Sequence, residues 1–206
     1  MNNRQRQSGF TLIEMMISML LGLVILGGTI TAYQAISSVS EQRDNYYKLQ
    51  DELMYIHRAL ASSVKVAKSV EINKGLNSLT LESYSGDGVR GIKCPGFDKG
   101  DAEVEWMTVH SGDNEQVLKC KLKSGREVEV ISLVSKGSVG ITSINFCSLP
   151  YDDEKQCGAG KSNSGIAVTV KYYDLKCDPD DESCDEKSVS FRLATRAPTS
   201  ALGVGR

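Results

Sequence analysis

The stretch Gly9-Phe10-Thr11-Leu12-Ile13-Glu14 decides the fold of this chain, because it places one acidic residue near the start of an otherwise apolar segment. It includes the end of a short basic leader that carries Arg4 and Arg6, and no further charged residue occurs between Glu14 and Glu41. A carboxylate inside a bilayer costs a few kcal/mol, by analogy with about 2.5–3.5 kcal/mol for charges at the centre of a membrane helix. Glu14 is therefore expected to have a partner.

The segment Met15–Ala35 contains no charged residue over 21 positions. At about 1.5 Å per residue, this length is enough to cross a hydrocarbon core of about 30 Å. A removable secretory signal has a shorter apolar core, followed by small residues and a cleavage site. A plain signal anchor with Arg4 and Arg6 at its cytoplasmic end is the alternative, and only Glu14 and the Gly9-Phe10 junction argue against it.

The leader Met1–Gly9 and the junction G-F-T-L-I-E closely resemble the cleavage and methylation site of type IV prepilins. The resemblance implies that a prepilin peptidase cuts between Gly9 and Phe10 and methylates the new amine of Phe10. Glu14 then pairs with the N-terminal amine of an adjoining subunit. It also implies a leader over residues 1–9, a transmembrane assembly helix over residues 10–36, and a periplasmic pilin head over residues 37–206 that includes the C-terminal half of the helix.

The residues that follow, Leu12-Ile13-Glu14-Met15-Met16-Ile17-Ser18 and Leu20-Leu21-Gly22-Leu23, are similar to the start of PilW-type minor pilins. This similarity implies a minor type IV pilin that helps to initiate pilus assembly and sits at or near the pilus tip. Its partners would be other minor and major pilins, the prepilin peptidase and the inner membrane, which it crosses once before it joins the pilus. The alternatives are a type II secretion pseudopilin and a tip subunit that directly binds DNA or a surface.

One helix is expected to run from about Phe10 to about Val70, because no glycine or proline interrupts Thr29–Lys74. Apolar residues in its second half recur mostly every three or four positions, which makes one stripe along a helix. The stripe consists of Val39, Tyr46, Leu49, Leu53, Ile56, Leu60, Val64 and Ala67. We expect this stripe to pack against a globular head.

After Gly75 the pattern changes to alternation, which is typical of strands. The expected strands lie near Leu79–Leu81, Val104–Thr108, Val117–Lys123, Glu127–Leu133, Val139–Phe146, Ile166–Leu175 and Ser188–Thr195. Lysines and glutamates are expected to face one another across the turn at Ser124-Gly125. Short loops imply an antiparallel sheet, so the predicted fold is α+β: a long N-terminal membrane-spanning helix that continues into a head with an antiparallel β-sheet, the pilin fold.

All six cysteines lie beyond residue 90, at Cys94, Cys120, Cys147, Cys157, Cys177 and Cys184. An even number in an exported region indicates disulfides in an oxidising compartment, and the absence of a C-x-x-C pair disfavours zinc. From proximity along the chain we expect the pairs Cys177–Cys184, Cys147–Cys157 and Cys94–Cys120. A C-terminal disulfide loop of this kind loosely resembles the D-region of pilin heads.

The loop between Cys177 and Cys184 is acidic, and Asp178, Asp180 and Asp181 could offer oxygen ligands to calcium. It lacks the turn glycine and the spaced final glutamate of a calcium loop, so a solvated acidic loop is favoured and no metal or other cofactor is expected.

The chain shows no pattern of catalytic residues. His57 and His110 stand apart and belong to neither a G-x-S-x-G nor an H-E-x-x-H motif, so we expect no enzyme. The net charge of −2 gives no general attraction to nucleic acid. Arg192, Arg196 and Arg206 form a small basic cluster that could contact DNA, although solvated tail charges are the favoured interpretation.

Overall fold

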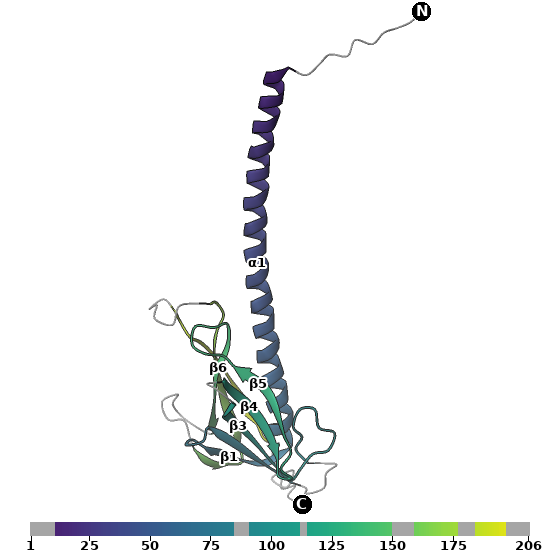
Figure 1. The fold of residues 1–206 in the computed structure, drawn as a ribbon. Helices are drawn as coiled ribbons and strands as arrows, with labels where there is room; N and C mark the ends of the chain where they lie inside the picture. The colour runs from purple at the N-terminus through teal and green to yellow at the C-terminus, as the bar shows by residue number, and fades with distance from the viewer. Residues whose placement is uncertain (1–10, 85–90, 112–114, 150–158, 177–183, 197–206) are drawn as a thin grey trace, which may run out of the picture. The chain divides into compact units, whose positions relative to one another are not determined.

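The computed structural model describes residues 11–84, 91–111, 115–149, 159–176 and 184–196. The described part of the chain consists of one helix, α1 (Leu12–Val66), followed by nine strands. The chain divides into two compact units, Met1–Asp44 and Asn45–Arg206. The first unit contains the N-terminal part of α1, and the second contains the remainder of α1 and all described strands (Figure 1).

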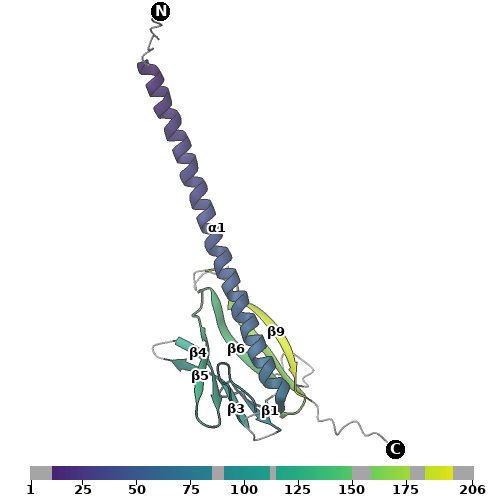
Figure 2. The ribbon, with the colours of Figure 1, turned by 90° about the vertical axis from the view of Figure 1, so that its right-hand side faces the viewer.

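The strands of the second unit form two antiparallel sheets (Figure 2). The larger sheet has the order β5-β4-β3-β2-β1-β7 and consists of β1 (Ala67–Asn73), β2 (Ser78–Ser83), β3 (Glu103–Ser111), β4 (Glu115–Leu122), β5 (Glu127–Leu133) and β7 (Gly160–Ser162). The smaller sheet has the order β6-β8-β9 and consists of β6 (Gly140–Ser148), β8 (Gly165–Tyr173) and β9 (Lys187–Ala194). The predicted α+β fold is confirmed, but the strands form two sheets where the sequence suggested one.

The helical stripe packs into a core shared by α1 and both sheets. Leu49, Ile56, Leu60 and Val64 are buried, as their spacing predicts. Strand residues from the two sheets complete the same core, among them Leu79, Leu81, Trp106, Leu118, Ile144, Ile166 and Val168. The stripe does not extend upward to Val39 and Tyr46, which are exposed.

Helix α1 ends four residues earlier than expected, at Val66, and β1 begins at the next residue. Ala67, Val70 and Ile72 are buried in β1, where they pack into the core from an extended backbone. Ala67 follows Val64 at a helical spacing of three positions, so the local spacing favoured a longer helix. These residues form a strand because β1 pairs in antiparallel fashion with β2 on one side and with β7 on the other.

Alternation gave the buried faces of β2 and β3 correctly. Leu79 and Leu81 of β2 pair with Trp106 and Val104 of β3, and all four side chains are fully buried. On the solvent side, the Nζ of Lys119 lies 3.3 Å from Glu127 and 3.2 Å from Glu129. The expected ion pairs across the β4–β5 turn are therefore present, and at this exposed position they contribute little to stability.

The turn between β1 and β2 joins the two sheets through Asn77. Asn77 has a φ of +45°, a conformation that asparagine tolerates better than most residues. Its side-chain amide donates hydrogen bonds to the Ile144 carbonyl in β6 at 2.6 Å and to the Thr108 hydroxyl in β3 at 3.1 Å. Asn77 thus links β3 of the larger sheet to β6 of the smaller sheet.

Candidate functional site

Helix α1 begins with a capped first turn. The hydroxyl of Thr11 accepts a hydrogen bond from the Glu14 N–H at 3.4 Å, and the Thr11 carbonyl accepts the N–H groups of Glu14 and Met15 at 3.1 and 3.3 Å. Thr11 and Glu14 have the T-x-x-E spacing of a capping box, which supplies partners to the free N–H groups of a helix start. The T-x-x-E spacing is visible in the sequence, but the predicted helix start at about Phe10 did not rest on it.

Glu14 lies in this first turn and is exposed within the isolated chain. The N-terminal end of a helix carries a partial positive charge, which stabilises a nearby carboxylate by about 0.3–1 kcal/mol in water. That contribution is smaller than the few kcal/mol that burying a charge in a bilayer costs. The helix start therefore orients and partly stabilises Glu14, and leaves most of the cost to be met by another group.

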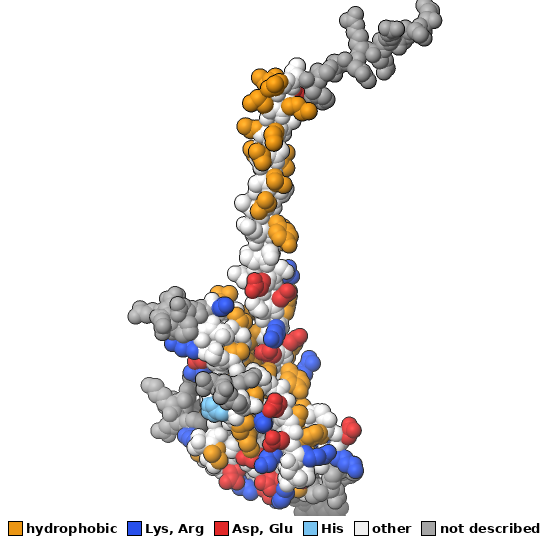
Figure 3. Space-filling model, in the orientation of Figure 1, with side chains coloured by type: hydrophobic (Ala, Val, Ile, Leu, Met, Phe, Trp, Pro, Cys, Tyr) orange, Lys and Arg blue, Asp and Glu red, His pale blue; other side chains and the backbone are white. Residues whose placement is uncertain are grey.

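The apolar segment that follows keeps its hydroxyl groups satisfied within the helix. Ser18 donates to the Glu14 carbonyl at 2.7 Å, Thr29 to the Leu26 carbonyl at 2.8 Å, and Thr31 to the Gly28 carbonyl at 2.9 Å. Bonds of this kind let polar side chains enter an apolar medium without unpaired donors. By length and composition α1 can cross a membrane, and Figure 3 shows its upper segment covered largely by hydrophobic side chains.

The predicted processing residues Gly9 and Phe10 lie outside the described residues, so the structure does not test cleavage between them. Phe10 directly precedes the capping residue Thr11 in the sequence. A chain cut after Gly9 would therefore begin one residue before the helix cap, and its new amine would be four positions before Glu14.

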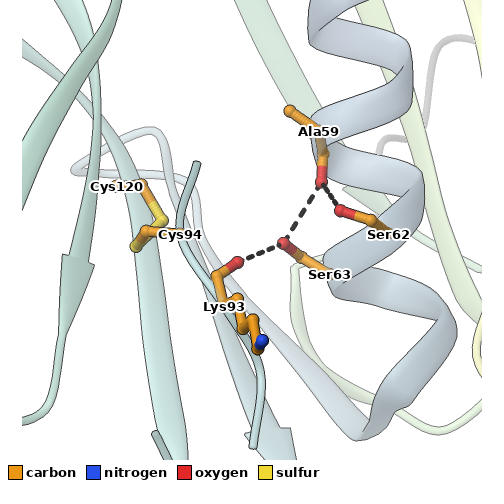
Figure 4. The surroundings of a disulfide bond; sticks show 6 residues. All are labelled: Ala59, Ser62, Ser63, Lys93, Cys94 and Cys120. Atoms are coloured by element: carbon orange, nitrogen blue, oxygen red, sulfur yellow. Dashed lines mark hydrogen bonds between the residues drawn. A yellow bond between two sulfur atoms is a disulfide. The ribbon is translucent and has the colours of Figure 1, made fainter. Parts of the chain in front are cut away.

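In the head, a disulfide joins Cys94 to Cys120, with the two Cα atoms 5.7 Å apart. Both side chains are buried, and this is the pairing expected from their proximity in sequence. Cys120 belongs to β4, whereas Cys94 belongs to the 91–101 loop between β2 and β3 (Figure 4). The disulfide thus fixes a loop that has little regular structure of its own.

The 91–101 loop is also bound to the last turns of α1. The Ser63 hydroxyl lies 3.1 Å from the Lys93 carbonyl and 3.2 Å from the Ala59 carbonyl, and the neighbouring Ser62 donates to the Ala59 carbonyl at 2.8 Å (Figure 4). Ser63 is buried, so its bond to Lys93 is shielded from water. The helix, the loop and β4 are therefore connected in series through Ser63, Lys93 and the Cys94–Cys120 bond.

Two glycines close the base of this loop. The Ile92 and Asp101 main chains exchange hydrogen bonds of 2.9 and 2.8 Å, which brings Gly91 and Gly100 together. A Cβ on Gly100 would lie 2.4 Å from the Gly91 carbonyl oxygen, and a Cβ on Gly91 would lie 2.6 Å from the Asp101 backbone. Only glycine fits at either position. Nothing in the sequence distinguished these glycines from ordinary loop residues.

The acidic side chain of Asp101 holds the far end of the loop. It accepts the N–H groups of Ala102 at 2.7 Å and Ser124 at 2.9 Å. Partial burial acts to raise the pKa of Asp101, but these hydrogen bonds outweigh it and keep the pKa below its usual value. The charged form is therefore the one that the loop requires.

Cys147 and Cys184 are also disulfide-bonded. Their expected partners, Cys157 and Cys177, lie outside the described residues, and the pairings Cys147–Cys157 and Cys177–Cys184 stay predictions.

The calcium candidates Asp178, Asp180 and Asp181 also lie outside the described residues. Within the described ranges there is no group of three or more His, Cys, Asp or Glu side chains able to hold a metal. Glu186, just after the acidic loop, accepts hydrogen bonds from Thr142 at 2.6 Å and from Lys171 at 2.8 Å. Partial burial acts to raise the pKa of Glu186, and these two bonds overcome it and lower the pKa.

The two histidines lie in different elements and contact different residues. His57 of α1 makes an edge-to-face contact with Phe191 of β9 at 4.9 Å between ring centroids, and His110 of β3 lies 3.1 Å from the Gln116 side-chain nitrogen. Neither contact resembles a nucleophile–base pair. Of the basic cluster, Arg192 lies in β9 and Arg196 shortly after it, while Arg206 lies outside the described residues.

The family model described as the prokaryotic N-terminal methylation motif matches residues 4–30. These residues contain the Gly9-Phe10 junction, the Thr11 cap and Glu14. The match supports a type IV pilin-like prepilin, a pilin or a pseudopilin, in agreement with the apolar helix and antiparallel head. No curated protein and no solved structure matches the chain.

Proposed function

We propose that this chain is a minor type IV pilin that helps to initiate pilus assembly and sits at or near the pilus tip. The observation that carries the proposal is the methylation motif over residues 4–30, placed at the start of a helix able to cross a membrane and continuous with a two-sheet head. A structural and not an enzymatic role fits this architecture, since its parts are suited to anchoring and assembly.

In this proposal a prepilin peptidase removes residues 1–9 and methylates Phe10. Residues 10–36 then form the transmembrane and assembly helix, and residues 37–206 form a periplasmic head before the subunit enters the pilus. The capped helix start holds Glu14 close to its own N-terminal end, where it is in reach of the terminal amine of a neighbouring subunit. Because each charge alone is unfavourable in lipid, their pairing selects a neighbour with the correct axial stagger.

The chain of 206 residues and its disulfide-linked head favour a minor subunit over a major one. A large head limits how closely identical copies can pack, and it offers more surface for specific contacts. A type II secretion pseudopilin is the second candidate, because the same motif and helix occur in that class and the match does not separate the two.

A gene deletion separates these roles. We expect loss or strong reduction of pili, normal protein secretion, and restoration of pili by the intact gene. Loss of secretion with normal pili would indicate the pseudopilin. Normal numbers of pili that no longer bind DNA or a surface would indicate a tip subunit that acts by binding. In each case a complementing gene with Glu14→Val tests whether the effect depends on assembly.

A further inference from the structure

The strand β9 has an open edge next to α1. In the part of the chain that the structure describes, β9 pairs with β8 alone and ends the smaller sheet. An unpaired edge presents backbone N–H and C=O groups that can bind a further strand. Figure 2 shows β9 lying beside the lower part of α1.

Two hollows follow the seam between α1 and β9. The first, of about 330 Å³, is lined by Leu53, Met54, His57, Arg58, Val189 and Phe191. The second, of about 440 Å³, is lined by Lys65, Val66, Ala194, Thr195 and Arg196. In both elements the residue numbers rise from the first hollow to the second, so α1 and β9 run in the same direction. We name this feature the α1–β9 seam.

The dimensions of the seam match an extended peptide. Leu53–Val66 spans about 20 Å of helix and Val189–Arg196 about 23 Å of strand, from the rise per residue of each element. A partner strand of about six or seven residues covers that length. Met54 and Val189 are 49% and 39% exposed, so apolar surface in the seam is available to alternate side chains of such a strand.

The charges of the seam have one sign. Arg58, Lys65 and Arg196 line it, and neither lining set contains an aspartate or a glutamate. Arg58 and Lys65 are seven positions apart and therefore lie on the same side of α1. Within the described ranges, neither of these two side chains forms an ion pair.

We propose that the α1–β9 seam receives an extended strand of a neighbouring subunit, in which apolar residues alternate and which carries carboxylates. The open edge binds its backbone, the apolar hollow takes its alternate side chains, and Arg58 and Lys65 pair with its acidic groups. The apolar lining of the first hollow favours a peptide over nucleic acid. The nature of the partner rests on the assembly role proposed above, whereas the geometry of the seam does not.

Photocrosslinking in the producing cell tests this inference on the full chain. Benzoylphenylalanine replaces Met54 in the seam or, as a control, Leu76, which is 66% exposed in the β1–β2 turn. We expect Met54→benzoylphenylalanine to crosslink to a segment of another subunit that contains apolar residues and at least one carboxylate, identified by mass spectrometry. The Leu76 position should give no such product.

A charge reversal completes the test. Arg58→Glu combined with Lys65→Glu should lower the crosslink yield by about tenfold, the change that 1.4 kcal/mol of binding free energy produces. Lys74→Glu combined with Lys99→Glu changes the net charge equally, away from the seam, and should leave the yield unchanged. All four side chains are exposed, and the melting temperature of each variant checks that the fold is intact.

The crosslinking experiment would overturn the inference if it gave no product above the Leu76 control, or a product with the chain's own residues 197–206, with nucleic acid or with lipid. A crosslinked segment without carboxylates would also overturn it. So would a crosslink yield that the charge reversal does not change. If the deletion strain loses its pili while the crosslink fails, the proposed function stands and the seam inference alone is wrong.

Discussion

Glu14 has a local role at the start of α1, and we propose an intermolecular role for it in assembly. The T-x-x-E cap places its carboxylate in the first turn of α1, where the helix itself offers only part of the stabilisation that burial in a membrane requires. Whatever supplies the remainder has to come from outside this chain's described residues. We therefore predict that Glu14 is dispensable for folding of the head and that it is needed for the proposed assembly.

The first prediction concerns Glu14→Val. The variant removes the charge and so lowers the cost of membrane residence, while it also removes the proposed pairing with a neighbour's amine. We expect normal amounts of protein in the inner membrane and a reduced amount in sheared pili, measured by immunoblot of both fractions. Glu41→Val, which removes an exposed charge beyond the apolar segment, is the matched control. Equal incorporation of Glu14→Val and wild type would show that the carboxylate has no part in assembly.

Glu82 of β2 illustrates how an exposed ion pair gives the head a pH dependence. Its carboxylate accepts hydrogen bonds from the Lys161 ammonium at 2.9 Å and from the Ser69 hydroxyl at 2.8 Å. The bond from Lys161 is the largest cause of a pKa below the usual 4.5 of a glutamate. The same contact fastens the short strand β7, which contains Lys161, to the sheet.

The second prediction follows from that lowered pKa. Because the folded pKa is lower than the unfolded value of 4.5, the stabilisation is fully present above pH 4.5 and is lost as the pH falls through the folded pKa. Glu82→Gln should therefore lower the melting temperature at pH 7, and the difference from wild type should shrink in acid. Thermal unfolding at a series of pH values measures this, with Glu105→Gln as a control for the loss of one negative charge. A difference that is constant with pH would contradict the assignment.

At the scale of elements, the 91–101 loop makes a second connection between α1 and the larger sheet, in addition to the direct one from Val66 to β1. Its attachments are the Ser63–Lys93 hydrogen bond, the Cys94–Cys120 disulfide and the Asp101 contacts with the β4–β5 turn. Arg126 adds a cation–π contact over the Phe97 ring, with its guanidinium carbon 4.8 Å from the ring centroid. A segment with so little secondary structure keeps its shape through these contacts.

The third prediction is that the double variant Cys94→Ser, Cys120→Ser loses about 3.5 kcal/mol of unfolding free energy, from the chain-entropy estimate for a loop of this length. The sequence separation that enters this estimate is 26 residues. Urea unfolding of the full chain in detergent, followed by circular dichroism, measures the loss. Dithiothreitol should have a smaller effect on this variant than on wild type, because one of the bonds it reduces is already absent. A loss well under 1 kcal/mol would mean that the loop is held mainly by its hydrogen bonds.

Elements with one clear periodicity could be predicted from the sequence, whereas the boundary between the helix and the first strand could not. Leu49, Ile56 and Leu60 repeat only as a helix does, and they are buried as expected. Ala67 continues the helical spacing from Val64, yet it lies in β1, because pairing with β2 and β7 decides the boundary. The strand β7 has three residues, which is too short for a recognisable pattern. Its formation depends on pairing with its neighbour β1.

At the scale of the whole chain, the order of the helix and the strands could be predicted more readily than their arrangement in space. The charge-free segment Met15–Ala35 predicts a helix able to cross a membrane, because the chemistry of a bilayer leaves few alternatives. The division of the strands into two sheets depends on contacts between distant residues, such as the bonds from Asn77 to Thr108 and Ile144. The α1–β9 seam is likewise visible only when residues 53–66 and 189–196 are brought together.

The fourth prediction concerns processing of the entire chain. Gly9→Leu should block cleavage, because a bulky side chain at the junction hinders access of the peptidase to the peptide bond. Intact-mass measurement of the wild type should show loss of residues 1–9 and one added methyl group on Phe10, while the variant should retain its leader. Gly22→Leu, which adds the same side chain within the apolar segment, should still be cleaved. A mature wild-type chain that begins at Met1, or after residue 30, would contradict the pilin proposal.

The position of Trp106 gives the Cys94–Cys120 bond a spectroscopic consequence. Trp106 is the chain's only tryptophan, is fully buried, and lies directly opposite Cys120 in the β3–β4 pairing. A disulfide accepts an electron from an excited indole and so quenches its emission. Reduction of this bond in the folded head should therefore brighten the emission without a red shift, whereas unfolding should shift it to longer wavelength. Emission intensity would then report oxidation of the disulfide, and emission wavelength would report folding of the head. The two processes could be followed separately in one sample without a label.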